Sequence, residues 1–224
     1  MAKKEFQAES KRLLDLMIHS IYTHKEIFLR EIISNASDAI DKLSYRSLTD
    51  EHVDMKREDF RIQIQADPQG RTLTVSDNGI GMDESDLENN LGVIASSGTY
   101  QFRQELEKED ADIESIGQFG VGFYSAFMVA DHIAVVTKKF GAEQAYRWES
   151  DGTDGYTITP CEKDTVGTDI IMHIKPDSEE GDYGQYLQEY TLRGLVKKYS
   201  DYIRWPIRME VTKSRKKADS PEDK

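Results

Sequence analysis

The sequence predicts an α+β fold in two layers, with helices on one face of a mostly antiparallel, mixed sheet. Segments near the amino terminus carry apolar residues at helical spacing, and several later segments alternate with a period of two. Short turns separate successive strands, which favours an antiparallel meander. A chain of 224 residues suits one such domain, expected here over residues 1–213.

Two helices are predicted first along the chain. Residues 9–22 have apolar side chains at helical spacing. A second helix is expected over 23–48, because Thr23 and Glu26 match a capping box in which the threonine caps and the glutamate reaches back.

One face of this second helix carries three polar residues, Glu31, Asn35 and Asp38. Their spacing of i, i+4 and i+7 places them on the same side. Such a stripe is either a solvated surface or part of a site, and spacing alone leaves both readings open.

The strands are predicted from alternation and turn signals. A β-hairpin is expected where strands at 61–66 and 72–76 flank the turn Asp67-Pro68-Gln69-Gly70. Further strands are expected at 132–138, 144–148, 156–159 and 168–175. After these strands we expect a helix that ends before Pro206, then a strand at 207–211, and then a charged, disordered tail at 214–224.

A carboxylate is predicted to leave one strand on the core side. Leu73 and Val75 point to one face of their strand, and Asp77 comes next on that face. A buried carboxylate without a partner costs several kcal/mol, so it needs a ligand or a neighbour. The alternative is an ordinary Asp-Asn-Gly turn, but Gly79 and Gly81 suggest a close approach to the backbone.

A glycine-rich stretch, IGQFGVGFYSAF over 116–127, places three glycines inside a hydrophobic segment. Gly117, Gly120 and Gly122 allow backbone N–H groups to converge on an anion, and the residues after them have helical character. The pattern is neither the dinucleotide fingerprint nor a Walker loop. It predicts a different phosphate cradle, the alternative being a tightly packed helix junction.

Composition excludes several classes of function. Formal net charge is −13, which disfavours nucleic acid and anionic membranes as partners. One cysteine, Cys161, permits neither an internal disulfide nor a thiolate zinc site, and the five histidines show no metal spacing. No apolar signal segment or bilayer-spanning run occurs, so we expect a reducing, cytoplasmic location.

Four motifs together carry a resemblance to a known superfamily. In order, they are Glu31-x-x-x-Asn35, DNGIGM over 77–82, the 117–127 segment and Gly167-Thr168. The set resembles the gyrase, chaperone, histidine kinase and mismatch-repair ATPases, which implies a Bergerat-type ATPase fold. MIHSIYTHKEIFLREIISNASDAIDKL and IGQFGVGFYSAF resemble more closely the amino-terminal ATPase domain of the heat-shock protein 90 chaperones, in their bacterial form.

The resemblance implies a role for each matching residue. Asp77 would accept a hydrogen bond from the adenine amino group, helped by Thr168 through water, with Met82 lining the adenine pocket. Asn35 would ligate Mg²⁺, and Glu31 would act as general base. The remaining nucleotide contacts implied, around the sugar and phosphates, are Asn90, Ser96, Ser97, Gly117, Gly120, Val121, Gly122 and Phe123. A lid is implied over about 89–120.

One segment departs from the family. Relatives usually read LGTIA, then Lys or Arg, then SGT, whereas this chain reads LGVIASSGT. Val93 therefore replaces a hydroxyl, and Ser96 stands where the family has a cation. A charge-assisted contact to phosphate is worth about 1–3 kcal/mol, so ATP affinity, lid closure or turnover is expected to differ.

The resemblance implies a Mg²⁺-dependent, ATP- and ADP-binding chaperone domain that cycles with client proteins. Family members dimerise through a carboxyl-terminal domain, and an arginine of a middle domain reaches the γ-phosphate, so weak turnover is expected of these 224 residues alone. Two alternatives stay open: the ATPase domain of a DNA topoisomerase or mismatch-repair protein, and a nucleotide-binding interaction module without hydrolysis.

Overall fold

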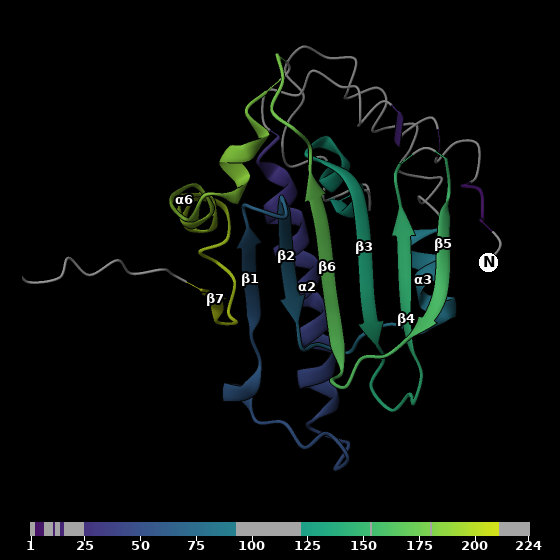
Figure 1. Cartoon of the computed structure of the whole chain (residues 1–224). Helices are drawn as coiled ribbons and strands as arrows, with labels where there is room; N and C mark the ends of the chain where they lie inside the picture. The colour runs from purple at the N-terminus through teal and green to yellow at the C-terminus, as the bar shows by residue number, and fades with distance from the viewer. Residues whose placement is uncertain are drawn as a thin grey trace, which may run out of the picture.

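In the computed structural model, one seven-stranded sheet has helices on one face (Figure 1). The structure describes residues 3–6, 11, 14–15, 25–92, 122–152, 154–179 and 181–210. It confirms the predicted two-layer α+β fold. Of the helix expected over 9–22, only Lys11, Leu14 and Asp15 are described, and the tail at 214–224 lies outside the described residues. No described helix is long and apolar enough to span a bilayer.

The strands follow the predicted ranges closely. They are β1 (Ile62–Asp67), β2 (Thr72–Asp77), β3 (Ala130–Lys138), β4 (Ala145–Ser150), β5 (Tyr156–Cys161), β6 (Gly167–Ile174) and β7 (Ile207–Met209). The predicted hairpin is confirmed, since β1 and β2 pair antiparallel from Ile62 opposite Asp77 to Asp67 opposite Thr72.

The meander prediction is correct for only part of the sheet. Strands β3, β4 and β5 form an antiparallel meander, but β6 returns to lie between β3 and β2, giving the order β5-β4-β3-β6-β2-β1-β7. Strand β7 pairs in parallel with β1. The central position of β6 joins the hairpin and the meander into one sheet, and its alternating buried residues, Thr168, Ile170, Met172 and Ile174, pack toward the helices.

Helix α2 (Ile27–Arg46) is the main element of the helical layer. Its apolar stripe is fully buried, including Phe28, Ile32 and Ile40. The described part of this helix begins at Ile27, with Glu26 at the cap position and without a side-chain cap bond. The Glu26 carboxylate accepts a hydrogen bond from the Tyr199 hydroxyl at 3.1 Å. Thr23, the other member of the predicted capping box, lies outside the described residues.

Shorter elements complete the layer. The predicted helical character after the glycines is confirmed as a 3₁₀ helix, η2 (Gly122–Met128), while α3 (Glu84–Leu91) was not predicted as a separate helix. The last predicted helix is two elements: η3 (Tyr183–Leu187) and α6 (Glu189–Tyr199), separated at Gln188. Residues before η3, including an isolated bridge from Ser178 to Gly181, connect it to β6.

Candidate functional site

A cavity of about 470 Å³ lies between the helical layer and the sheet. Its walls come from α2, the loop after β2, α3, η2 and the inward faces of β3 and β6. The lining includes all the described residues that the sequence predicted for the site: Glu31, Asn35, Asp77, Met82, Asn90, Gly122, Phe123 and Thr168. Residues far apart in the sequence therefore meet around one space.

The polar stripe of α2 forms the helical wall of this cavity. Glu31, Asn35 and Asp38 all line it, which favours the site reading of the stripe over that of a purely solvated face. Their environments differ: Glu31 is buried, with 6% of its surface exposed, whereas Asn35 and Asp38 are exposed. Partial burial beside the carboxylate of Asp41 raises the pKa of Asp38.

Asp77 ends β2 and points into the cavity, as the alternation predicted. Its Oδ1 accepts a hydrogen bond from the backbone N–H of Gly79 at 2.8 Å. Loss of hydration at this position raises the pKa of Asp77 to about 7, despite that hydrogen bond and a weaker one from the Thr168 backbone. The side chain is half-buried, with the cavity as its open side. A carboxylate can accept about four hydrogen bonds, so these two backbone donors leave Asp77 able to accept another from a ligand in the cavity.

The loop after Asp77 is fastened to both layers. Ile80 donates its N–H to the Ala39 carbonyl of α2 at 3.0 Å and accepts from Phe140 N–H at 2.8 Å. Gly79 must be glycine here, because a Cβ would come within 2.4 Å of the Ala39 carbonyl carbon. Gly81 has φ +67°, and a Cβ there would lie 2.0 Å from the Lys138 carbonyl oxygen. The glycines of DNGIGM thus permit close backbone contact between the layers.

Elsewhere in the cavity wall, Gly122 at the start of η2 lies against the carboxylate of Glu31. A Cβ on Gly122 would lie 2.5 Å from Glu31 Oε2, so only glycine leaves that carboxylate its position. The second oxygen, Oε1, accepts from Arg30 Nη2 at 2.6 Å and from Arg30 Nε at 2.8 Å. Glu31 is therefore buried, ion-paired and placed beside the start of η2.

Sequence reasoning missed a charged cluster at the cavity mouth. Lys139 Nζ lies 2.7 Å from Asp83 Oδ2 and 2.7 Å from Asp86 Oδ2. These aspartates form the capping box of α3, where Asp83 accepts from the Asp86 N–H at 2.9 Å and Asp86 from the Asp83 N–H at 3.1 Å. The Asp83-x-x-Asp86 spacing was the available signal for both the helix and its charged start.

Five predicted site residues, Ser96, Ser97, Gly117, Gly120 and Val121, lie outside the described residues, as do Val93 and most of the proposed lid. Of that 89–120 segment, residues 89–91 end α3 and Gly92 caps it. Tyr124 joins this cap region to η2, since its buried hydroxyl donates to the Leu91 carbonyl at 2.6 Å.

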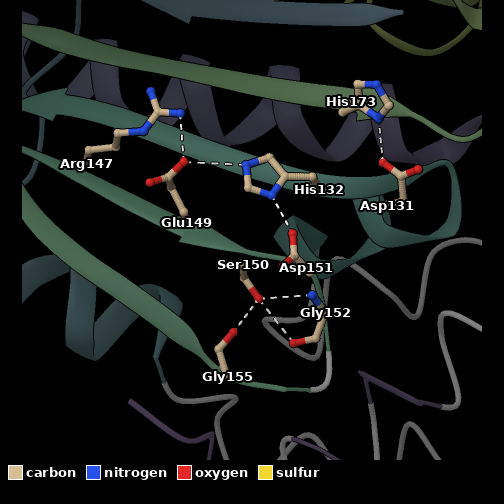
Figure 2. A network of polar contacts seen from close by, with 9 residues as sticks. All are labelled: Asp131, His132, Arg147, Glu149, Ser150, Asp151, Gly152, Gly155 and His173. Carbon is tan, nitrogen blue, oxygen red and sulfur yellow. Dashed lines mark hydrogen bonds and ion pairs between the residues drawn. The ribbon is translucent and has the colours of Figure 1, made fainter. Parts of the chain in front are cut away.

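A second polar network lies on the opposite face of the sheet (Figure 2). His132 contacts Asp151 at 2.5 Å and Glu149 at 3.5 Å, and Glu149 also accepts from Arg147 at 2.8 Å. His173, directly across from His132 in the β3–β6 register, pairs with Asp131 at 2.6 Å. No group of three potential metal ligands is placed to hold an ion within the described part of the chain. Both histidines thus lie within contact distance of carboxylates on this face of the sheet.

Comparison with known proteins agrees with this geometry. The model of the family described as histidine kinase-, DNA gyrase B-, and HSP90-like ATPase matches residues 22–170, most of the chain. Chaperone protein HtpG of Clostridium botulinum (strain Langeland) is 58% identical over 224 residues, which are 100% of this chain and 36% of that protein. The HtpG of Clostridium perfringens (strain 13) is 59% identical over 217 residues, 97% of this chain and 35% of that protein.

The chain thus spans about a third of the length of the curated relatives it matches. The family match begins before α2 and ends within β6, so it includes every described residue that lines the cavity. This chain belongs to the family of histidine kinase-, DNA gyrase B- and HSP90-like ATPases.

Proposed function

We propose that this chain is the ATP-binding and ATP-hydrolysing domain of a molecular chaperone. Membership of an ATPase family carries nucleotide binding with it. The chaperone assignment is supported by the HtpG relatives, which are 58–59% identical to this chain. The observation that carries the proposal is Asp77, a desolvated carboxylate that lines a cavity large enough for a small-molecule ligand.

The adenine end of the ligand would lie against Asp77. An exocyclic amino group donates hydrogen bonds, which a carboxylate that faces the cavity can accept. Met82 and Ile170 give the same region apolar walls, which suit the faces of a purine ring. Asn90, on α3, would face the sugar and phosphates from the opposite rim.

The phosphate end would lie near Gly122 and Asn35. The start of η2 offers backbone N–H groups with no side chain at its first position, and Phe123 lines the cavity beside it. Ser96, Ser97, Gly117, Gly120 and Val121 are proposed to complete this end.

Magnesium fits the chemistry of the described lining. Among the described residues, the lining contains four carboxylates, those of Glu31, Asp38, Asp77 and Asp86, and two lysines, Lys42 and Lys139, so its formal charge is negative. An anionic phosphate chain entering such a site needs a cation. Asn35 is exposed to the cavity and presents an amide oxygen, a ligand suited to Mg²⁺. When bound, the ion would neutralise phosphate charge.

Glu31 is the proposed general base. It lies one helical turn from Asn35, which places it beside the phosphate end without making it a ligand of the adenine. Burial and the Arg30 pair hold its carboxylate in one orientation, as a residue that directs an attacking water requires.

The activity of the whole protein is proposed from its relatives. Nucleotide state would drive lid closure and a conformational cycle on client proteins in the cytoplasm, with homodimerisation and middle-domain contacts provided by other parts of a longer chain. Nothing in the described site favours a topoisomerase, a mismatch-repair protein or a module that binds without hydrolysis.

Calorimetric titration with ATP and Mg²⁺, followed by single-turnover hydrolysis, tests the proposal. We expect saturable binding with one nucleotide per chain and slow hydrolysis that duplex DNA does not stimulate. Absence of ATP and ADP binding by the folded chain would refute the function. Strong stimulation by DNA would favour the topoisomerase class instead.

A further inference from the structure

One row of side chains on the inward face of the sheet is polar where its neighbours are apolar. Asp77 on β2 is the register partner of Thr168 on β6, and Thr168 is the register partner of Thr137 on β3. Two residues earlier along β2, the corresponding row contains Val75, Ile170 and Val135. A hydrophobic face thus ends in three adjacent oxygen-bearing side chains, of which Asp77 and Thr168 line the cavity.

Thr137 is the member of this row that no nucleotide role explains. It is fully buried, and it is absent from the cavity lining, unlike Asp77 and Thr168. A buried hydroxyl must find partners or lose the free energy of its lost hydration. Its β-branched side chain suits a strand, so the sequence pattern alone gives no hint of a special position.

The hydroxyl of Thr137 contacts three groups, and chemistry fixes most of the directions. The backbone N–H of Met82 donates to Thr137 Oγ1 at 2.9 Å. The Gly167 carbonyl lies 3.2 Å from the same oxygen and can only accept, so Thr137 gives its single hydrogen there. The third neighbour is Thr168 Oγ1 at 3.0 Å.

This arrangement determines what Thr168 presents to the cavity. With its hydrogen on Gly167, Thr137 can only accept from Thr168. The Thr168 hydrogen is then directed away from the cavity, and its lone pairs remain for a ligand. All three contacts of Thr137 are hydrogen bonds in this pattern. If Thr137 instead donated its hydrogen to Thr168, it would have none left to donate to the Gly167 carbonyl.

We propose that Thr137 is a positioning residue that holds the Thr168 hydroxyl as an acceptor, so that Asp77 and Thr168 together select an exocyclic amino group over a carbonyl. The inference rests on the proposed nucleotide-binding function and adds a cause of base selectivity to it. A 6-aminopurine donates two hydrogens toward such an edge. A 6-oxopurine places a carbonyl oxygen against the Thr168 lone pairs.

A purely structural role for Thr137 predicts something different. Its bond from Met82 N–H also fastens the loop over the cavity, so removing the hydroxyl would loosen the site for every nucleotide. That effect cancels in the ratio of affinities for two nucleotides that differ only at the purine edge. The ratio for ATP over inosine triphosphate therefore isolates the orientation of Thr168.

The test is calorimetric binding of ATP and of inosine triphosphate, each with Mg²⁺, to wild type, Thr137→Val and Thr137→Ser. Working at pH 8 keeps Asp77 ionised, since its pKa is about 7. We expect Thr137→Val to lower the affinity ratio about fivefold, because Thr168 is freed to donate to the carbonyl. Thr137→Ser retains the hydroxyl and should retain the ratio.

Controls separate this inference from the proposed function. Thr74→Val, on the outward face of β2, should leave both affinities unchanged. In a Thr168→Val background, Thr137→Val should no longer change the ratio. If Thr137→Val fails to fold, Thr137→Ala takes its place against Thr137→Ser. An unchanged ratio in a folded variant that lacks the hydroxyl overturns the inference, whereas loss of ATP binding by wild type refutes the function itself.

Discussion

The Asp77 carboxylate accepts a hydrogen bond from the Gly79 N–H at 2.8 Å, and yet its pKa is raised to about 7. Desolvation is the largest cause, and the nearby carboxylate of Asp169 adds to it, against the weaker influence of Lys163. The site therefore keeps an ionisable group in a state that costs free energy when the cavity holds no ligand. Such a cost is typical of a binding position.

Asp77→Asn is expected to stabilise the ligand-free chain at high pH. The folded-state pKa, about 7, lies above the ordinary value of 3.8, so the penalty is absent at low pH and grows as pH rises toward 7. Because the carboxyl is half-buried, we expect about 2 kcal/mol of added unfolding free energy at pH 8 and a smaller gain at pH 5. Urea unfolding measures this. Asp54→Asn, at an exposed position outside the cavity, is the control; a gain independent of pH would contradict the account.

Glu31→Ala is expected to separate hydrolysis from binding. The carboxylate is buried beside the proposed phosphate end and makes its described contacts with Arg30, not with the adenine end. Single-turnover hydrolysis should fall by about a hundredfold or more, as for loss of a general base, while calorimetric ATP affinity changes little. Cleavage at the wild-type rate would remove Glu31 from the catalytic role.

Gly122→Ala tests the close contact between η2 and Glu31. The added Cβ would lie 2.5 Å from Glu31 Oε2, so the carboxylate has to move. We expect single-turnover hydrolysis to fall by about tenfold or more, and by more than ADP affinity, because a small displacement of a catalytic group is costly. The matched control is Gly194→Ala on α6, where a Cβ meets no atom within 4 Å and hydrolysis should be unaffected.

Lys139→Met tests the charged cluster at the start of α3. Lys139 lowers the pKa of Asp83, so this stabilisation is present above pH 3.8 and is lost as pH falls through the depressed folded value. The groups are about a third exposed, which limits the expected loss to about 1 kcal/mol of unfolding free energy at pH 7. Urea unfolding should show a smaller loss in 1 M salt (about 3 Å screening length). A loss that salt does not reduce would indicate packing of the lysine stem.

Period-two alternation predicted correctly that Asp77 lies on the inward face of β2, where it lines the cavity. Asp77 follows Leu73 and Val75 on one strand, and a strand keeps alternate residues on one face whatever its neighbours are. The polar stripe of α2 could also be predicted from the sequence, because helical spacing determines which residues share a face. Local geometry of this kind does not depend on how the strands are ordered.

Long-range placement was beyond the sequence pattern. Strand β6 lies between β2 and β3, which places Thr168 beside both Asp77 and Thr137. The sequence of one strand does not show which other strands it pairs with. Lys139 was missed for the same reason, since its partners lie more than fifty residues earlier.

Calorimetric titration of Asp77→Asn with ATP and Mg²⁺ tests the central claim most directly. With the circular dichroism and unfolding transition of a folded chain, this variant should lose ATP affinity by about a hundredfold or more, because an amide offers the purine amino group one weaker acceptor in place of a carboxylate. Asp54→Asn should bind as wild type does. Near-normal ATP affinity in folded Asp77→Asn would contradict the assignment of this cavity as a nucleotide site recognised through Asp77.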